Sequence, residues 1–536
     1  LTHTQLSLYF ESQLDPAGLA YNIPGAFRLP GGVDPQRLEA AFRRLIAAEP
    51  LLRTAIVFTP QGLRQKVAER AEFSLPYLDS ASFEEAEAAF IKPFDLSAPP
   101  LLRAALWQEP SGGTILFIDM HHIISDGIST PVYLDRLDRF YRGESLKAPE
   151  LRYMDYAYWL DRQPEKREAL DYWRRRLLPA AEGLDLPPEG RPNAFDYQGA
   201  RYAFGLDEPT SRACQEYCDR RGLTPYMFFM AVYGLLLAKA SGSGDFIVGT
   251  PVSGRTRREL MDMPGAFMHP LPFRLTPARE LSLAQWLEQV KADVLDMINY
   301  QGCSIADLTA MVAEAGGRSG QAEANQPLYR VMFHYRPLSP SSFTLEGKPL
   351  EFLPLEARRA KLDLNLEAGK EDGRFCFWLE YALSLFDEPT IALYSRSFKT
   401  LAAEILRDDS QKIGQVSAAS PEDRLLLIEK PNRVRMPYEN RCLDQLFDDM
   451  AQILPNHAAI RWRGEALSYR ELRLRSDALA AHLLDSGARP GDIIALTHKR
   501  TPDIITALLG ILKAGCAYMP LLTSFPANRL SYMLEN

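Results

Sequence analysis

The chain has 536 residues, a hydrophobic content of 46%, a charged content of 24% and a formal net charge of −8. This composition is typical of a soluble folded protein with about three or four domains of ~150 residues each. The mild negative charge does not favour a nucleic-acid partner. We expect no signal peptide, and the longest apolar run, near 227–238, is too short to span a bilayer, so we also expect no membrane partner.

The six cysteines are scattered, without a Cys-x-x-Cys pair. Cys214 and Cys218 lie four residues apart on a predicted helix, a spacing more typical of a packed core than of a metal site. This cysteine usage fits a reducing compartment, so we expect a cytoplasmic location and no metal. The chain begins at Leu1 rather than methionine, and we therefore expect a piece of a longer protein.

The first predicted elements are helices. Residues 1–12 predict one, and a second begins at Asp34 and Pro35, which supply a side-chain cap and a proline in the first position. The second helix has one apolar face and ends near Pro50. Arg53 then precedes a strand at 55–58, where an arginine is usually a surface or snorkelling residue.

Two adjacent histidines end a predicted buried strand. Residues 101–108 and 114–120 flank a Pro/Gly turn and predict a β-hairpin whose second strand leads to His121 and His122. Neighbouring side chains on an extended segment point to opposite sides. We therefore expect one imidazole to face a cavity, where it suits proton transfer near neutral pH, and the other to pack into the protein.

An Asp-Gly turn follows the histidines at Asp126 and Gly127. Ser129 or Thr130 is expected to cap the next helix, with Pro131 in its first turn. Asp126 has two possible roles: to hold the loop by pairing with an arginine, or to orient an imidazole as a triad acid does. The plainer alternative is a buried histidine pair satisfied by backbone groups, beside an ordinary turn.

The second half of the chain repeats this order of elements. A strongly apolar helix runs from a Thr224-Pro225 cap to about 237, and a strand at 246–255 ends in a Gly-rich turn with Arg255. Alternation predicts strands at 362–367 and 375–381, and Asp387 caps a helix to about 406. Residues 416–440 lack periodicity and predict a linker. Beyond it, 477–485 and 503–514 predict helices and 492–497 a strand, in βαβ order.

Several motifs resemble one family. The string HHIISDG at 121–127 resembles the HHxxxDG signature of the condensation domains of nonribosomal peptide synthetases, whose His-x-x-x-Asp core is shared by chloramphenicol and carnitine acyltransferases. YMDYAYW at 153–159 and VGTPVSGR at 248–255 are similar to further motifs of that family. ALSYREL at 466–472 and LKAGCAYMP at 512–520 resemble the first two motifs of adenylation domains.

The resemblance implies an α/β fold with two chloramphenicol-acetyltransferase-like lobes, residues 1–165 and 166–415, arranged as a V around a central tunnel. A linker at 416–440 and a partial α/β N-terminal subdomain of an adenylation domain at 441–536 would follow. The sequence ends before any Ser/Thr/Gly-rich phosphate loop. We therefore expect the adenylation fragment to be inactive.

The resemblance also implies a reaction. A donor acyl or peptidyl thioester and an acceptor aminoacyl thioester would form an amide, each carried on the 4′-phosphopantetheine arm of a carrier protein. The expected partners are the upstream donor carrier, the downstream acceptor carrier and the rest of the adenylation domain, and no cofactor is expected to bind this chain itself. A general base contributes roughly 10²–10⁴-fold, and holding two tethered reactants together contributes much of the rest.

The residues that match the family's motifs receive roles from it. His122 would be the catalytic histidine, and the position of Gly127 lets its N–H approach a developing oxyanion. His121 and Asp126 would support the site, and Arg255 is the candidate partner of Asp126, its alternative being a solvated arginine in an Arg-rich turn. The remaining expected site residues are Arg53 at the base of the site and, next to the substrate, His269, Pro270 and Ser129.

The sequence departs from the family at three places. Ala48-Glu49-Pro50 stands where the family has Arg-His-Glu, His269-Pro270 replaces Asn-Thr, and 300–308 keeps little beyond Gln301. An inactive condensation-like platform that recruits partners therefore stays open, as does a coenzyme-A-dependent acyltransferase. An epimerisation domain would follow a carrier domain instead of preceding an adenylation domain, and a heterocyclisation domain would carry aspartate in place of the histidines.

Overall fold

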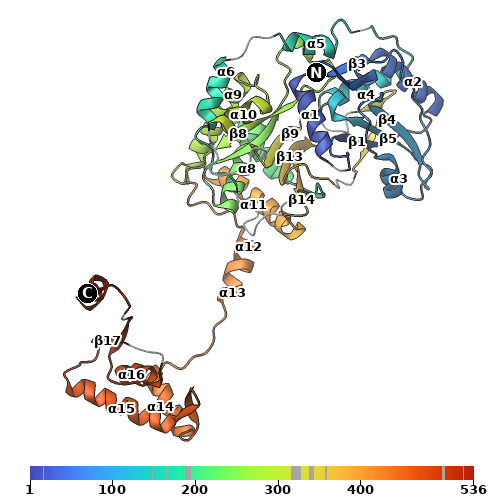
Figure 1. The fold of residues 1–536 in the computed structure, drawn as a ribbon. Helices are drawn as coiled ribbons and strands as arrows, with labels where there is room; N and C mark the ends of the chain where they lie inside the picture. The colour runs from blue at the N-terminus through green and yellow to red at the C-terminus, as the bar shows by residue number, and fades with distance from the viewer. Residues whose placement is uncertain are drawn as a thin grey trace. The chain divides into compact units, whose positions relative to one another are not determined.

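The computed structural model describes residues 1–15, 17–147, 149–162, 167–184, 186, 195–315, 328–336, 343–355, 359–497, 501–522 and 524–535. The chain divides into two compact units, Leu1–Ile428 and Glu429–Asn536. Within the first unit, the predicted lobe boundary at 165/166 lies outside the described residues. Figure 1 shows the elements of its first half and of its second half side by side.

The first half of unit 1 is built on a four-stranded sheet with strand order β12-β1-β5-β4, and β2 and β3 form a separate antiparallel pair. The predicted hairpin is confirmed as β4 and β5, with Leu102 opposite Met120. The elements of this half are α1 (His3–Leu14), β1 (Asn22–Arg28), α2 (Pro35–Ala48), the 3₁₀ turn η1 (Pro50–Arg53), β2 (Thr54–Thr59), β3 (Gly62–Val67), α3 (Phe83–Phe90), β4 (Leu102–Gln108), β5 (Thr114–His121), the 3₁₀ turn η2 (His122–Ile124), α4 (Ser129–Tyr141) and α5 (Tyr153–Leu160).

Helix α2 begins where the sequence predicts it. The Asp34 side chain accepts hydrogen bonds from the backbone N–H groups of Gln36 and Arg37, and Pro35 occupies the first helical position. These N–H groups have no partner inside the helix, so the carboxylate satisfies them. The predicted apolar face is buried and consists of Leu38, Phe42, Leu45 and Ile46.

The edge strand of this sheet comes from the second half of the chain. Strand β12 (Glu351–Leu353) pairs antiparallel with β1, and Ala26 lies opposite Leu353. Leu345 and Leu350 are buried in the same core as α2 and α4. The first lobe is therefore completed by residues that sequence order alone assigned to the second lobe.

The second half is built on a six-stranded sheet of order β6-β14-β13-β9-β7-β8. Strand β13 runs parallel to β9 and antiparallel to β14. The elements of this half are α6 (Arg167–Leu177), β6 (Gly199–Gly205), α7 (Glu208–Arg221), α8 (Pro225–Ser241), β7 (Phe246–Val252), the 3₁₀ turn η3 (Arg258–Leu260), β8 (His269–Leu275), α9 (Leu283–Asn299), α10 (Ile305–Glu314), β9 (Val331–Arg336), β10 (Thr344–Leu345), β11 (Lys348–Pro349), β13 (Leu364–Glu371), β14 (Arg374–Ala382) and α11 (Glu388–Arg407).

The two faces of this sheet differ in polarity. Leu364, Leu366 and Ala368 of β13 are fully buried among the helices, while the intervening Asn365 and Glu367 line a cavity. This alternation follows from the two-residue period of a strand. The buried face packs around α8, which contacts α9 and α11. One side of the second lobe is therefore an apolar core, and the other is a polar cavity wall.

Helix α8 is apolar because it lies in this core. The Thr224 side chain caps it and Pro225 starts it, as predicted. The predicted core location of Cys214 and Cys218 on α7 is also confirmed, since both are fully buried among apolar side chains. Among the described residues, no single helix has both the length and the hydropathy of a membrane span; α7 and α8, bent by 108°, meet the criteria together by length and composition only.

The segment predicted as a linker contains short helical turns: α12 (Pro421–Arg424), a π-helical turn η5 (Leu425–Glu429) and α13 (Lys430–Asn432). In unit 2, β17 and β18 pair in parallel, which confirms the predicted βαβ order. Ala480, Ile511, Ala514 and Cys516 form its small core. The elements are α14 (Leu443–Ile453), β15 (Ala458–Trp462), β16 (Glu465–Ser468), α15 (Tyr469–Asp485), β17 (Ile493–Thr497), α16 (Pro502–Lys513), β18 (Ala517–Leu521) and α17 (Ala527–Glu535).

Candidate active site

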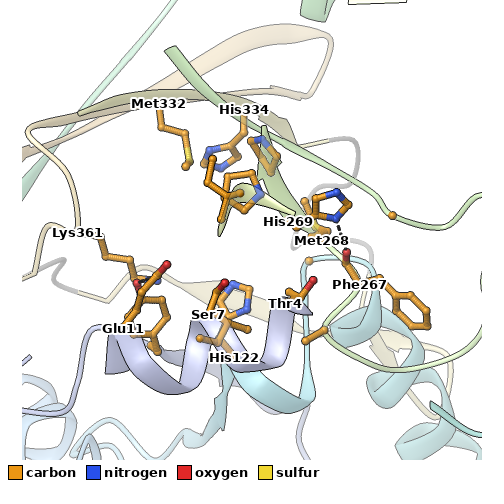
Figure 2. Close-up of a pocket in the computed structure, with 18 of the residues that line it drawn as sticks. Thr4, Ser7, Glu11, His122, Phe267, Met268, His269, Met332, His334 and Lys361 are labelled. Carbon is orange, nitrogen blue, oxygen red and sulfur yellow. Dashed lines mark hydrogen bonds between the residues drawn. The ribbon is translucent and has the colours of Figure 1, made fainter. Parts of the chain in front are cut away.

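A cavity of about 2450 Å³ lies between the two halves of unit 1. Its walls come from α1, β1 and the turn after β5 in the first half, and from β8, β9, β13 and β14 in the second. His122, Gly127, His269 and Pro270 line it. Figure 2 shows Met332 and His334 of β9 across the cavity from His122.

The two histidines point in different directions, as the sequence predicts. The His121 side chain is buried, and its Nδ1 accepts a hydrogen bond from the backbone N–H of Ile123 at 3.1 Å. His122 begins the 3₁₀ turn, its own N–H donates to the Tyr21 carbonyl at 2.8 Å, and its side chain lines the cavity. The end of β5 therefore uses one histidine to fix the turn and presents the other to the cavity.

His122 is held in its neutral form. Burial and then the nearby positive charge of Lys361 lower its pKa to about 4, although the Asp126 carboxylate acts in the opposite direction. Burial and the neighbouring His122 likewise lower the pKa of His121 to about 3. The Nδ1 atom of His122 is buried, with no hydrogen-bond partner among the described residues.

The Asp126 carboxylate is fully engaged by other groups. It accepts hydrogen bonds from Arg255 Nη1 at 2.7 Å, from the Ser129 N–H at 2.8 Å and from the Phe267 and Met268 N–H groups at 3.1 and 3.2 Å. Burial would raise the pKa of this carboxyl, but the hydrogen bonds and charge of Arg255 and the Ser129 bonds lower it overall. In the described part of the chain it makes no hydrogen bond to an imidazole, so the arrangement differs from a catalytic triad.

Arg255 is the partner predicted for Asp126, and its side chain is fully buried. Its guanidinium also donates to the carbonyls of Leu260 and Met263, both at 3.1 Å. The preceding Gly254 has a φ of +64°, and a Cβ there would lie 2.3 Å from the Phe267 carbonyl oxygen. The Gly-rich turn therefore needs glycine to deliver Arg255 to the loop that carries Asp126.

The predicted place of Ser129 beside the substrate is wrong. Its side chain is fully buried and is not among the described residues that line the cavity. The hydroxyl donates to Asp126 at 2.7 Å and accepts from the Gly265 N–H at 2.9 Å and from Arg255 at 3.0 Å. It acts instead as a buried link between α4 and the 265–268 segment.

The predicted cap of α4 is also corrected. Neither Ser129 nor Thr130 caps the helix with its side chain; the residue before α4 is Ile128, whose side chain makes no cap hydrogen bond. The Asp126 carboxylate accepts the N–H groups of Ile128 and Ser129 instead. A carboxylate near the start of a helix is favoured by the helix dipole, so Asp126 serves both the ion pair and the helix.

Arg53 does not lie at the base of the site, in contrast to the prediction. Its guanidinium donates to the carbonyls of Ile46 at 3.0 Å and Ala47 at 3.3 Å, near the end of α2, and to that of Glu69 at 3.1 Å. Carbonyls in the last turn of a helix lack an N–H partner from within the helix. Arg53 therefore folds back to satisfy this helix end and is not among the described residues of the cavity wall.

Gly127 lines the cavity, but its backbone does not require glycine. It is not among the residues with a left-handed backbone, and a Cβ would meet only Met268 Sδ, at 3.7 Å. Such a distance is ordinary van der Waals contact. The absence of a side chain at this position therefore leaves space in the cavity beside His122.

His269 and Pro270 begin β8 in the cavity wall, and Pro270 lies opposite Pro251 of β7. His269 Nδ1 lies 3.1 Å from the Phe267 carbonyl, and Nε2 lies 2.9 Å from the Gln301 carbonyl. A neutral imidazole has one N–H and donates only one of these bonds. Among the described residues, no cluster of histidine, cysteine and carboxylate side chains is arranged to hold a metal ion.

Sequence reasoning missed several polar residues of the cavity. Thr4, Ser7 and Glu11 lie along one face of α1 and line it (Figure 2). Their spacing of three and four residues was a readable signal of a shared helix face. Lys361 and Tyr21 also line the cavity, but neither belongs to a motif. Only the fold brings these two residues to the cavity that His122 also lines.

The comparisons with known proteins agree with this architecture. The condensation-domain family model matches residues 1–428, and the AMP-binding enzyme model matches residues 447–536. The chain therefore belongs to the condensation-domain family, and this domain is followed by the start of an AMP-binding domain. The predicted family and the predicted two-lobed α/β fold are confirmed.

The relatives are subunits of peptide synthetases. Tyrocidine synthase 3 of Brevibacillus parabrevis is 31% identical over 547 residues, which cover 100% of this chain and 8% of that protein. Surfactin synthase subunit 2 of Bacillus subtilis (strain 168) is 32% identical over 538 residues, covering 99% and 15%. The holo form of AB3403, a four-domain nonribosomal peptide synthetase bound to AMP and glycine, has a TM-score of 0.81 at 22% identity, covering 100% of this chain and 42% of that structure.

Proposed function

We propose that this chain forms amide bonds in nonribosomal peptide synthesis. A donor acyl or peptidyl thioester and an acceptor aminoacyl thioester would meet in the cavity, each on the 4′-phosphopantetheine arm of a carrier protein. The proposed partners are an upstream donor carrier, a downstream acceptor carrier and the remainder of the adenylation domain. The start of the AMP-binding domain is proposed to be inactive by itself, and no cofactor is proposed to bind this chain.

One observation carries the proposal: a neutral histidine faces a cavity large enough for two tethered reactants. Pockets for single small ligands measure roughly 300–1,000 Å³, whereas this cavity measures about 2450 Å³. His122 lies in its wall, and the turn that carries His122 is fixed by the Ile123–His121 bond and by the buried Asp126–Arg255 pair. These contacts support a preorganised reacting position.

The proposed role of His122 is to accept a hydrogen bond from the acceptor amine. Its Nδ1 is buried, so Nε2 is the nitrogen left for the amine. With a pKa of about 4, the imidazole is a weak base and holds a full proton poorly near pH 7. Orientation of the amine therefore accounts for its contribution better than complete proton transfer. The amine nitrogen bonds to the donor carbonyl carbon, the C–S bond breaks, and the thiol leaves with the proton that the nitrogen gives up.

A single-turnover assay with loaded carriers tests this proposal. Donor and acceptor carriers are mixed with the wild-type chain or with His122→Ala, and intact-protein mass spectrometry follows the transfer. We expect amide product on the acceptor carrier, formed roughly 10²-fold more slowly by His122→Ala, because the amine loses its orientation. Equal rates would show that His122 has no chemical role.

The same assay distinguishes the alternatives. A platform that only recruits partners would bind carriers without forming product. An epimerisation domain would invert the α-carbon of a single loaded carrier, which chiral analysis of the released amino acid detects. A coenzyme-A-dependent acyltransferase would accept a free acyl thioester as well as one on a carrier. Any of these results in place of amide formation overturns the proposal.

A further inference from the structure

Lys361 places a positive charge in the wall of the cavity that His122 also lines. It lies three residues before β13, and its Nζ atom is 4.4 Å from the centroid of the Tyr21 ring. Figure 2 shows its side chain reaching towards Glu11 of α1, with His122 further away, near Ser7. In the described part of the chain, this ammonium group makes no ion pair or hydrogen bond. No motif used above includes it.

Tyr21 connects Lys361 to His122. The Tyr21 carbonyl accepts the His122 backbone N–H at 2.8 Å, and its ring lies under the Lys361 ammonium. The Tyr21 hydroxyl donates to the Glu11 carboxylate. A cation over an aromatic face is attracted by the ring quadrupole. One tyrosine therefore fixes the backbone of His122, supports Lys361 and engages the Glu11 carboxylate.

Two carboxylates face Lys361 from neighbouring elements, Glu11 of α1 and Glu380 of β14, and both act to raise its pKa. The Lys361 side chain is exposed at the cavity surface, and partial desolvation there nevertheless lowers the pKa of this ammonium group overall. Glu11 is already bonded to Tyr21. The positive charge is thus partly balanced by these carboxylates.

The charges that face His122 are those of Lys361 and Asp126, with the neutral His121 beside it. Asp126 is neutralised by Arg255. Lys361 is the largest charge effect on the His122 pKa, and it also lowers the pKa of His121. Its field therefore reaches the place where the proposed function puts the acceptor amine.

We propose that Lys361 is a positioning residue whose ammonium group keeps an acceptor amine beside His122 in the uncharged, nucleophilic form. The inference rests on the proposed function. A free α-amino group has a pKa of about 7.7–8.0, so much of it is ammonium at pH 7. A like charge nearby disfavours the cation. The α-ammonium group of the acceptor gives its proton to solvent before it attacks the donor. The N–C bond then forms, the C–S bond breaks, and the thiol leaves with the second proton of the amine.

The pH dependence of the single-turnover rate tests this inference in the full chain. The variants are Lys361→Met, which removes the charge, Lys361→Arg, which keeps it, and Lys370→Met, a control at an exposed lysine in β13. We expect the acid limb of the profile to move to higher pH by about one unit in Lys361→Met. Lys361→Arg and Lys370→Met should follow the wild type, and all rates should converge near pH 9.

The results separate this inference from the proposed function. Amide formation with the same acid limb in wild type and Lys361→Met overturns the role of Lys361 alone. An equal shift in Lys361→Arg also overturns it, because size rather than charge would then matter. A wild-type chain that forms no amide at any pH overturns both proposals. Thermal unfolding of each variant identifies a folding defect, in which case Lys361→Gln replaces Lys361→Met.

A second measurement does not require turnover. The ¹³Cε1 resonance of His122, assigned with His122→Gln, reports the protonation of its ring. We expect this ring to begin to titrate at a higher pH in Lys361→Met than in the wild type, because a neighbouring cation has been removed. An unchanged titration would overturn the electrostatic role.

Discussion

At the scale of single residues, the site depends on an ion pair that is completely removed from water. The Asp126 and Arg255 side chains have no exposed surface and are joined at 2.7 Å. A buried charge is tolerated only when it is paired and hydrogen-bonded. The surrounding N–H groups, the Ser129 hydroxyl and two backbone carbonyls meet this condition. The pair therefore fixes the loop after His122, although within the described residues neither side chain hydrogen-bonds to the imidazole.

Removal of the Arg255 side chain should destabilise unit 1. We expect Arg255→Met to reduce the free energy of unfolding of unit 1 by about 3–5 kcal/mol, because it leaves a buried carboxylate unpaired. Urea denaturation measures this loss. Arg258→Met, at an exposed arginine of the same loop, is the matched control and should change stability by less than about 0.5 kcal/mol. Similar values for the two variants would contradict the importance of the pair.

The low pKa values of the two histidines predict a dependence of stability on pH. In the folded state, His121 and His122 titrate at about 3 and about 4, below the ordinary value of 6.5. The unfolded chain binds their protons first, so stability falls as the pH falls from 6.5 towards 4, by up to about 1.4 kcal/mol per pH unit for each histidine. Denaturation at pH 5–7 should show a shallower slope for His122→Gln than for the wild type or the control His3→Gln.

Asp119 has the opposite effect on the pH dependence of stability. Burial raises its pKa to about 7, although Arg103 and Asn22 act to lower it. The folded chain therefore binds this proton before the unfolded chain does, which stabilises the fold at acid pH and is lost as the pH rises through 7. Asp119→Asn should make the loss of stability on acidification steeper. An unchanged slope would contradict the raised pKa.

At the scale of elements, two positions of the site need glycine for different reasons. Gly254 has a left-handed backbone, and a Cβ there would clash with the Phe267 carbonyl oxygen, so glycine at this position allows the turn after β7 to deliver Arg255. Gly127, with an ordinary backbone, leaves space beside His122. One glycine is required by the backbone and the other by what the cavity must admit.

Alanine substitutions at the two glycines should have different effects on stability and on the rate of amide formation. We expect Gly254→Ala to destabilise unit 1 by about 1–3 kcal/mol, because of its backbone strain and close contact. Gly127→Ala should leave thermal unfolding unchanged and slow amide formation by roughly 10- to 100-fold, because the added methyl group displaces a reactant. A stable Gly254→Ala, or a fully active Gly127→Ala, would contradict the assignment concerned.

At the scale of the whole molecule, the two halves of unit 1 do not separate along the chain. Strand β12 and Leu345 and Leu350 complete the sheet and core of the first half, and Arg255 reaches its loop. The cavity is therefore a product of both halves. A boundary drawn at one point of the sequence does not describe this arrangement.

Fragments test this dependence. We expect residues 1–165 alone to aggregate or to show no cooperative unfolding, because the sheet lacks its edge strand and the core lacks its later side chains. Residues 1–428 should unfold cooperatively. Circular dichroism with thermal melting compares the two fragments. A stable, cooperative fragment 1–165 would show that β12 is dispensable.

The sequence by itself determined the features that depend on neighbouring residues. The cap of α2, the β4–β5 hairpin, the opposite directions of His121 and His122 and the βαβ order of unit 2 follow from short-range periodicity and turn chemistry. The motif string identified the family and suggested Arg255 as the partner of Asp126. These inferences succeed because the relevant hydrogen bonds and spacings lie within a few residues. The Asp126–Arg255 pair is the exception: it is long-range, but both of its residues belong to motifs of the family.

Only the tertiary structure decided the features that depend on distant segments. Arg53 meets the end of α2, Ser129 is buried under the 265–268 segment, and Asp126 takes over the cap of α4. The positive charge of Lys361, 239 positions further along the sequence, contributes to the low pKa of His122. Burial and charge are set by everything that packs around a group, so no local pattern reveals them. For that reason the type of site could be read from the sequence, but its electrostatics could not.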